Sequence, residues 1–238
     1  MPMVRSQQFN PCDYQWLMTP HNKTCMLQRY NKIEWQVNAD FFLMRAFMDQ
    51  SVRQRLGGGD CQRFLLEISR DNILDDSLQK IVHVKPIEDH DPLKLPISAR
   101  FAGEPGVDEG GVRKEYFQLV VKELLSPAYA MFQYNEDVQL YYFNGMTLEP
   151  NIYFELIGIL MGIAVYNNTF IDLPFPMACF KVLVGEEPNL DDLRQWQPET
   201  AKSLEQMLNW DEAKMGGTMQ DVLCRTFTAD VESFGEVI

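Results

Sequence analysis

The 238-residue sequence has few of the residues that build metal centres and disulfide frameworks. It contains three histidines and five cysteines, an odd number, and no two cysteines form a Cys-x-x-Cys pair. This scatter excludes the common zinc motifs and a disulfide scaffold, and it is typical of reduced thiols in the cytosol or nucleus. We therefore expect a cytoplasmic or nuclear protein with no cofactor and no metal.

Basic residues are also scarce. Lys and Arg total 21 against 34 Asp and Glu, which gives a formal net charge of −13. A chain this acidic is repelled by a phosphate backbone, so no nucleic-acid partner is expected. A protein partner with a basic or mixed surface fits the charge better.

Long hydrophobic runs are missing as well. The longest, residues 152–166, is about 15 residues, contains Glu155 and is shorter than the roughly 20 residues that cross a bilayer. The first residues lack the apolar segment of a secretory signal, so no membrane association is expected. The run predicts a buried helix in which Gly158 and Gly162 share one face and allow another element to approach the backbone closely.

The composition is that of a globular chain, with 46% apolar residues available for a core. Apolar periodicity and turn residues predict a mainly helical α+β fold. Helical segments are expected at residues 23–55 (ended by the glycines at 57–59), in the turns that follow Asp71, and at 112–124, 152–166, 176–184, 190–195 and 199–209. Strands are expected at residues 64–69, 97–101, 131–134, 139–143 and 223–228, the third and fourth forming a hairpin.

The most informative local pattern is a glycine-rich loop, residues 103–111, that leads into an amphipathic helix. Its spacing is neither Gly-x-Gly-x-x-Gly nor a Walker loop, and Asp108 and Glu109 would repel a phosphate, so nucleotide binding is not expected. Asp108 is instead a suitable helix cap. Beyond the cap, the spacing predicts one apolar face, with Arg113 and Lys114 facing away from it.

Two further patterns have both a chemical and a structural interpretation. Cys25 follows His21 by four residues, which on a helix places a base near a thiol, but the apolar neighbours of Cys25 favour a structural role. Asp71, Asp75 and Asp76 lack the spacing and glycine of a calcium loop, and they favour a cap and a solvated helix face.

Residues 64–238 resemble the N-terminal lobe of the HECT ubiquitin ligase domain, nearest to small HERC and E6-associated-protein-like members. The fold implied is a HECT N-lobe with short β-strands and hairpins around a buried central helix. By this resemblance, residues 1–20 are unassigned, 21–63 form a helical extension, 64–198 form the large subdomain, and 199–238 begin a truncated small subdomain. The matching runs, in the family's order, are residues 70–72, 103–117, 131–132, 140–144, 156–158, 164–167, 175–176 and 234–235.

The family accepts ubiquitin from a ubiquitin-conjugating enzyme (E2) onto a cysteine of a C-terminal lobe and transfers it to substrate lysines. That cysteine lies in a Thr-Cys-Phe-type motif, and the sole Thr-Cys here is Thr24-Cys25, followed by Met26. We therefore assign no catalytic residue. The resemblance implies an E2-docking entry at Ser203, Leu204, Met207, Leu208 and Trp210, although the four-residue spacing of Leu204 and Leu208 equally suits the core face of a helix.

Two hypotheses follow. In the first, the chain is a segment of a ligase that scaffolds E2 docking, with ubiquitin and protein substrates as further partners. In the second, it is a complete, non-catalytic helical interaction module without transfer activity. The apolar ending Val237-Ile238 favours the first, because an exposed natural terminus is more commonly polar.

Overall fold

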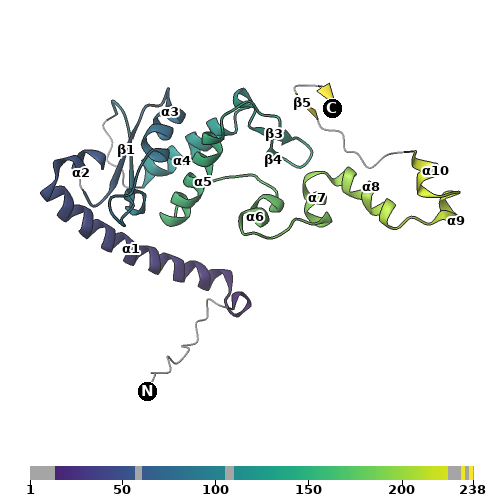
Figure 1. The fold of residues 1–238 in the computed structure, drawn as a ribbon, viewed down its shortest axis with the longest axis horizontal. Helices are drawn as coiled ribbons and strands as arrows, with labels where there is room; N and C mark the ends of the chain where they lie inside the picture. Colours follow the sequence, from purple (N-terminus) through teal and green to yellow (C-terminus); the bar gives the residue numbers. More distant parts are fainter. Residues whose placement is uncertain (1–13, 57–60, 105–109, 225–231, 234–235, 238) are drawn as a thin grey trace, which may run out of the picture. The chain divides into compact units, whose positions relative to one another are not determined.

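The computed structural model describes residues 14–56, 61–104, 110–224, 232–233 and 236–237. Contacts between residues divide the chain into two compact units (Figure 1). Unit 1 comprises residues 1–123 and 151–171, and unit 2 comprises residues 124–150 and 172–238. The chain therefore leaves unit 1, returns to it for one helix, and leaves it again.

Helices predominate in both units, which confirms the mainly helical α+β fold class. The regular elements of unit 1 are α1 (Pro20–Met48), α2 (Gln50–Arg55), β1 (Phe64–Ile68), α3 (Ile73–Ser77), β2 (Ile97–Phe101), α4 (Gly111–Leu124, whose last residue is counted with unit 2) and α5 (Asn151–Tyr166). Those of unit 2 are β3 (Phe132–Asn135), β4 (Leu140–Phe143), α6 (Met177–Leu183), α7 (Leu190–Trp196), α8 (Pro198–Leu208), α9 (Glu212–Met215), α10 (Met219–Leu223), β5 (Glu232–Ser233) and β6 (Glu236–Val237).

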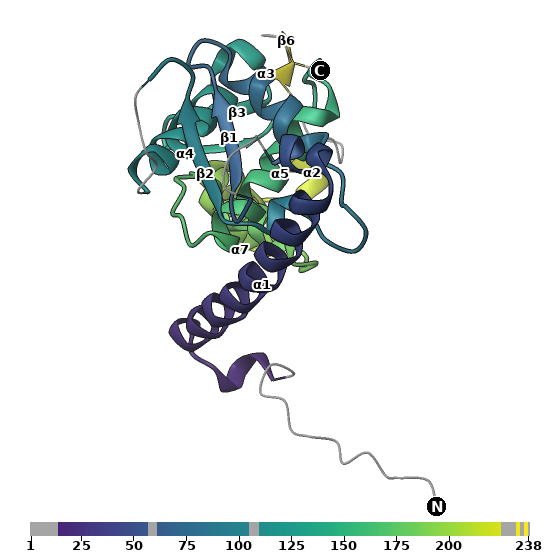
Figure 2. The ribbon, with the colours of Figure 1, turned by 90° about the vertical axis from the view of Figure 1, so that its left-hand side faces the viewer.

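The two strands of unit 1 form a small parallel sheet, with Phe64 opposite Ile97 and Ile68 opposite Phe101. They lie side by side in Figure 2. Each strand alternates between buried and more exposed positions, as a half-buried strand does. The predictions for residues 64–69 and 97–101 are confirmed. Between them, the helix predicted after Asp71 is α3, which continues into a π-helical turn at Leu78–Val82.

The amphipathic helix after the glycine-rich loop is α4. Tyr116, Phe117 and Val120 are fully buried, and the hydroxyl oxygens of Tyr116 and Ser77 are 2.9 Å apart. Burial raises the pKa of Tyr116. The outward orientation predicted for Arg113 is wrong: Arg113 is half-buried, and its guanidinium donates to the Ile97 carbonyl at 3.4 Å. Asp108 and Glu109 lie outside the described residues.

Arg70 connects both sides of the glycine-rich segment. Its guanidinium donates to Glu104 at 2.5 Å and to Glu115 at 2.8 Å, and it lies 3.9 Å above the ring of Phe101. A planar guanidinium can bind two carboxylates and stack on an aromatic ring at the same time, which Lys cannot do. Arg70 therefore links the end of β2 to α4.

The long apolar run is α5, and one side of this helix is buried through Leu156, Leu160 and Ala164. Gly158 and Gly162 lie on the exposed side, and a Cβ atom built at either would meet nothing within 4 Å. In the described part of the chain, the expected close approach at these glycines is therefore wrong. Apolar residues surround the helix, so the sequence did not reveal which side packs.

Unit 2 begins with an antiparallel hairpin in which Phe132 lies opposite Phe143 and Asn135 opposite Leu140. The rings of Phe132, Phe143 and Phe175 have centroids 5.2 to 5.8 Å apart and form an aromatic cluster. The predicted hairpin and the helices near residues 176–184, 190–195 and 199–209 are confirmed.

The strand expected at residues 223–228 is wrong at its start, because Leu223 is the last residue of α10. The Thr218 side chain accepts a hydrogen bond from the Asp221 backbone and caps this helix. The cap at Thr218 thus places Leu223 in a helix. Residues 225–231 lie outside the described residues.

Asn167, at the end of α5, joins that helix to the sheet. Its side chain is buried, its Oδ1 accepts from the Ile97 backbone at 2.9 Å, and its Nδ2 donates to the Ile163 carbonyl at 3.0 Å. Removing the amide leaves the Ile97 N–H unpaired in a buried place, which is costly, whereas the Ile163 carbonyl still accepts from the Asn167 backbone.

We therefore expect Asn167→Ala to lower the free energy of unfolding by about 1–3 kcal/mol. Urea denaturation measures this change, and hydrogen exchange at the Ile97 amide should accelerate. Asn22→Ala, at an exposed position in the first turn of α1, is the control and should change stability by less than about 0.5 kcal/mol. Equal effects of the two substitutions would show that the amide of Asn167 does not hold the sheet.

Candidate functional site

The predicted docking residues lie on and after α8, which is supported by α7 and the hairpin. Asn135 on β3 donates its side-chain amide to the Trp196 carbonyl at 2.8 Å. The Trp196 ring packs against Tyr142 of β4 with a centroid distance of 5.3 Å. The end of α7 is therefore fixed to the hairpin, and α8 begins two residues later.

The start of α7 is held by a capping box. The Asn189 side chain accepts from the Asp192 backbone, and the Asp192 carboxylate accepts from the Asn189 backbone at 2.8 Å. The same carboxylate accepts from the Lys181 ammonium of α6 at 2.7 Å. These bonds, the one from Lys181 above all, hold the pKa of Asp192 below its ordinary value.

On α8, one face changes from buried to exposed along its length. Ala201 is completely buried, whereas Leu204 is 37% exposed and Leu208, two turns after Ala201, is 75% exposed. Positions three and four residues apart share a face of a helix. The C-terminal half of α8 therefore presents two leucines to solvent, and the alternative in which both are core residues does not match their exposure.

The other predicted site residues are placed differently. Ser203 lies on another side of α8, and its hydroxyl donates to the Glu199 carbonyl at 2.9 Å. Met207 and Trp210 are half-buried, and the indole Nε1 of Trp210 donates to the Gly217 carbonyl at 3.1 Å. Trp210 thus braces the turn between α9 and α10. Leu204 and Leu208 are the pair that the helix brings together.

Two exposed apolar residues that follow this pair in the chain were not predicted. Met215 at the end of α9 is 48% exposed, and Val222 on α10 is 47% exposed. The short helices are initiated by side-chain caps at Asp211 and Thr218. These capping residues are the sequence signal that could have placed both apolar residues on helices.

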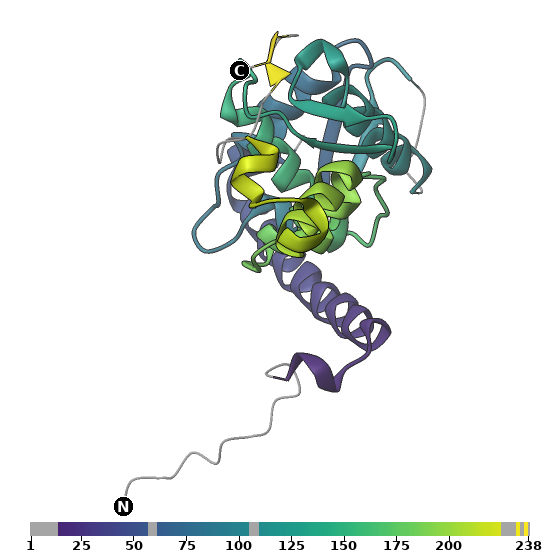
Figure 3. The same cartoon turned by 90° about the vertical axis from the view of Figure 1, so that its right-hand side faces the viewer.

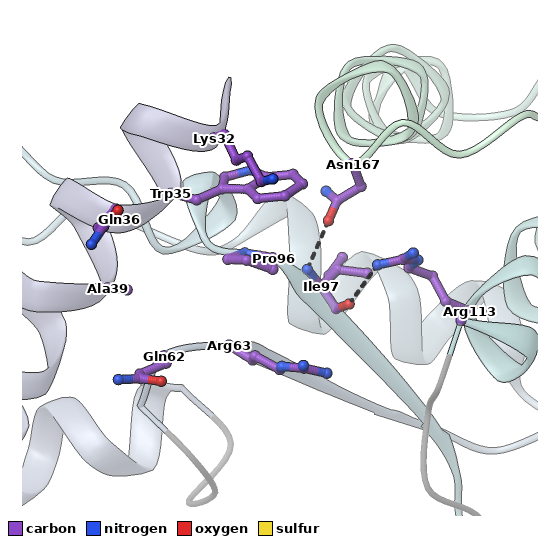
Figure 4. Close-up of a pocket in the computed structure, with 11 residues that line it drawn as sticks. Lys32, Trp35, Gln36, Ala39, Gln62, Arg63, Pro96, Ile97, Arg113 and Asn167 are labelled. Carbon is purple, nitrogen blue, oxygen red and sulfur yellow. Dashed lines mark hydrogen bonds between the residues drawn. The ribbon is translucent and has the colours of Figure 1, made fainter. Parts of the chain in front are cut away.

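Unit 1 contains a separate cavity of about 690 Å³ next to α1 (Figure 4). Lys32, Arg63 and Arg113 bring three positive charges to its wall. The described lining residues include no Asp, Glu, His, Cys or Ser. The cavity therefore offers positive charge and hydrogen-bond donors, with no carboxylate, imidazole, thiol or hydroxyl group among those residues. No sequence pattern pointed to it, because α1, β2, α4 and the residues just before β1 and just after α5 contribute from distant positions.

The described cysteines differ in accessibility. Cys61 and Cys179 are buried, and burial raises the pKa of the Cys179 thiol, which disfavours the nucleophilic thiolate. Cys25 is half-buried with its sulfur 3.6 Å from His21 Nε2, so the expected proximity of base and thiol is present. Cys224 is exposed, and its thiol donates to the Asp221 carbonyl at 3.3 Å.

Within the described ranges, no cluster of three or more His, Cys, Asp or Glu side chains could hold a metal ion. The helices in those ranges also include none with the length and apolar character needed to span a membrane.

Known proteins are similar to this chain over nearly its whole length. The HECT-domain (ubiquitin-transferase) family matches residues 118–238, just over half of the chain. The chain belongs to the HECT family. The probable E3 ubiquitin-protein ligase HERC4 of Homo sapiens is 35% identical over 94% of this chain and 20% of that protein.

Other members of the HECT family are similar over comparable ranges. The probable E3 ubiquitin-protein ligase HERC3 of Homo sapiens is 33% identical over 99% of this chain and 22% of that protein. The E3 ubiquitin-protein ligase RSP5 of Saccharomyces cerevisiae is 31% identical over 85% of this chain and 24% of that protein. The chain thus spans about a fifth of the length of the HERC relatives that it matches.

The lowered pKa of Asp192 predicts a pH-dependent contribution to the support of α8. A carboxyl group whose pKa is lower in the folded state stabilises that state above its ordinary pKa of about 3.9, and the contribution disappears as the pH falls through the folded-state value. We therefore expect Asp192→Asn to lower the melting temperature at pH 7, and the difference from the parent chain to narrow below about pH 4.

Thermal denaturation followed by circular dichroism across this pH range measures the effect. Asp191→Asn is the matched control, because Asp191 pairs with Arg194 at the exposed surface and should contribute little. If the difference in melting temperature between Asp192→Asn and the parent chain does not narrow below about pH 4, the ionised Asp192 carboxylate does not stabilise the folded state.

Proposed function

We propose that this chain provides the surface on which a HECT ubiquitin ligase docks its ubiquitin-conjugating enzyme, and that α8 to α10 form that surface. The exposure of Leu204 and Leu208 on the supported helix α8 is the observation that carries the proposal. Leucines exposed on a helix whose preceding turns are packed offer apolar area that a partner can remove from water.

Charge around these leucines indicates the chemistry of the partner. From Pro198 to Leu223 the sequence has two basic residues, Lys202 and Lys214, and five acidic ones: Glu199, Glu205, Asp211, Glu212 and Asp221. An E2 surface that combines apolar side chains with Lys or Arg would complement this segment. Such complementarity mainly increases the association rate and should weaken as salt is added.

The chemistry of transfer then belongs to the ligase as a whole. Ubiquitin passes from the E2 thioester to a ligase thiol, and from there to the amine of a substrate lysine. In our proposal none of the cysteines of this chain is that thiol, and the chain positions the charged E2 for the first step. Ubiquitin and protein substrates are partners of the complete reaction.

We expect Leu208→Asp to weaken E2 binding by about tenfold or more, because a buried Leu side chain contributes about 1.5–3 kcal/mol. Calorimetric titration of the 238-residue chain with a panel of purified E2 enzymes measures the dissociation constants. Leu148→Asp is the matched control, since Leu148 is 85% exposed and lies outside α8 to α10.

A circular dichroism spectrum confirms that each variant is folded before titration. If every E2 that binds the parent chain binds Leu208→Asp equally well, or if Leu148→Asp causes the same loss, α8 is not the docking helix. Failure of the whole panel to bind the parent chain would reject the proposed function.

The assignment of no catalytic cysteine makes a separate prediction. When the chain is incubated with activating enzyme, E2, ubiquitin and ATP, no ubiquitin adduct sensitive to a thiol reductant should form on it. Non-reducing electrophoresis detects such adducts. A reductant-sensitive band that disappears in Cys25→Ala or Cys224→Ala would contradict the assignment and would identify the reactive thiol.

A further inference from the structure

Helix α1 carries an exposed row of apolar side chains. Large apolar residues exposed singly are ordinary on a protein surface, but a row of six along one helix is not. On α1 the exposure of the row ranges from 43% at Met26 to 92% at Phe47. Its members are Met26, Tyr30, Ile33, Val37, Met44 and Phe47.

The spacing of this row is that of a coiled coil. The steps from Met26 to Phe47 alternate between four and three residues when Asp40 is included, which is a repeat of 3.5 residues over three heptads. A helix covering a globular core follows the 3.6-residue period and turns its apolar stripe inwards. Here the heptad row faces solvent and extends about 30 Å.

The opposite face of α1 already has partners in unit 1. Asn31 and Phe42 are buried, Asn31 donates to the Tyr166 carbonyl at 3.1 Å, and the Trp35 and Tyr166 rings are 5.9 Å apart. These contacts fix the rotation of α1 about its axis. The heptad row cannot turn inwards without breaking them, so it needs a partner from outside unit 1.

We propose that α1 is a self-association surface, on which α1 of a second copy of this chain packs in parallel and in register as a two-stranded coiled coil. Tyr30, Val37 and Met44 then occupy the a positions. Met26, Ile33, Asp40 and Phe47 occupy the d positions.

Charge complementarity selects a second copy in this orientation. In a parallel pair, each g residue faces the e residue five positions later on the partner helix. Arg29 at g therefore faces Glu34 of the second copy, which places opposite charges together on both sides of the seam. Within its own copy Glu34 is half-buried and 3.9 Å from Lys94, and Arg29 is exposed.

At the other end of the helix, the flanking positions extend the apolar seam. Leu43 at g and Met48 at e are 47% and 72% exposed and would face each other across the pair. The first turns of α1 project past the other elements of unit 1 (Figures 2 and 3). The heptad row lies opposite the face of α1 that packs on unit 1. A two-fold axis parallel to the paired helices therefore places the two copies of unit 1 on opposite sides of the coiled coil.

Asp40 is the single charged residue of the row and sets the strength of the interaction. Two copies of Asp40 meet at the same d layer, where like charges repel and a carboxylate loses its water. Replacing Asp40 by Leu should therefore strengthen the dimer, a gain that a merely damaged helix could not produce.

The test is sedimentation equilibrium of the 238-residue chain over a wide range of concentrations. The mass should rise from 27.7 kDa towards twice that value as the concentration increases. Val37→Glu and Phe47→Glu should weaken the dimer by at least about tenfold, and Asp40→Leu should tighten it by at least about tenfold.

Two controls make the test specific to this surface and orientation. Phe170→Glu matches Phe47→Glu, because both phenylalanines are 92% exposed, and it should leave the dimer unchanged. Arg29→Glu should weaken the dimer, and adding Glu34→Arg to that variant should restore it, since the pair is then reversed across the seam.

The proposal is overturned if the parent chain and Asp40→Leu both stay at 27.7 kDa throughout. It is also overturned if the chain dimerises but Val37→Glu and Phe47→Glu do not weaken the dimer. Failure of the double charge reversal to restore the dimer rejects the parallel, in-register arrangement. All these variants lie outside α8 to α10, so the outcome is independent of E2 docking.

Discussion

Two consecutive residues at the end of α5, Tyr166 and Asn167, position the elements of unit 1. The Tyr166 carbonyl accepts from Asn31 of α1, and its hydroxyl donates to the Lys94 carbonyl just before β2. The Asn167 amide bonds both β2 and α5. Because the buried Asn31 amide must be paired, its bond to the Tyr166 carbonyl determines how α1 is rotated. The exposure of the heptad row on α1 follows directly from that rotation.

Unit 2 is organised as a series of supports that weaken along the chain. The aromatic cluster holds the hairpin, the hairpin holds Trp196 of α7, and α7 precedes α8. Beyond α8, the short helices are held by caps and by the hydrogen bond from Trp210, with little buried apolar area. Segments held in this way open at low free energy, which suits a surface that adapts to a partner.

Much of the fold was predictable because its signals are local. Residues 97–101 alternate between apolar and polar, the hairpin is rich in aromatic residues, and α8 has a helical apolar period. The predictions were wrong where contacts between residues distant in sequence determine the orientation of a helix face or a side chain. The packed side of α5 was undetermined because apolar residues surround it, and Arg113 turned towards the Ile97 carbonyl, a partner distant in sequence. A cap at Thr218 extended helix to Leu223.

The sequence by itself determined the family, the mainly helical class and the positions of Leu204 and Leu208 on a helix, since motif order and periodicity are properties of the chain alone. The tertiary structure decided which leucines remain exposed, because exposure depends on whether a neighbouring element covers that turn. It also decided that the apolar row of α1 faces solvent. The buried face of that helix has Asn31 and Asn38 beside Phe42, and the bond from Asn31 to the Tyr166 carbonyl selects it.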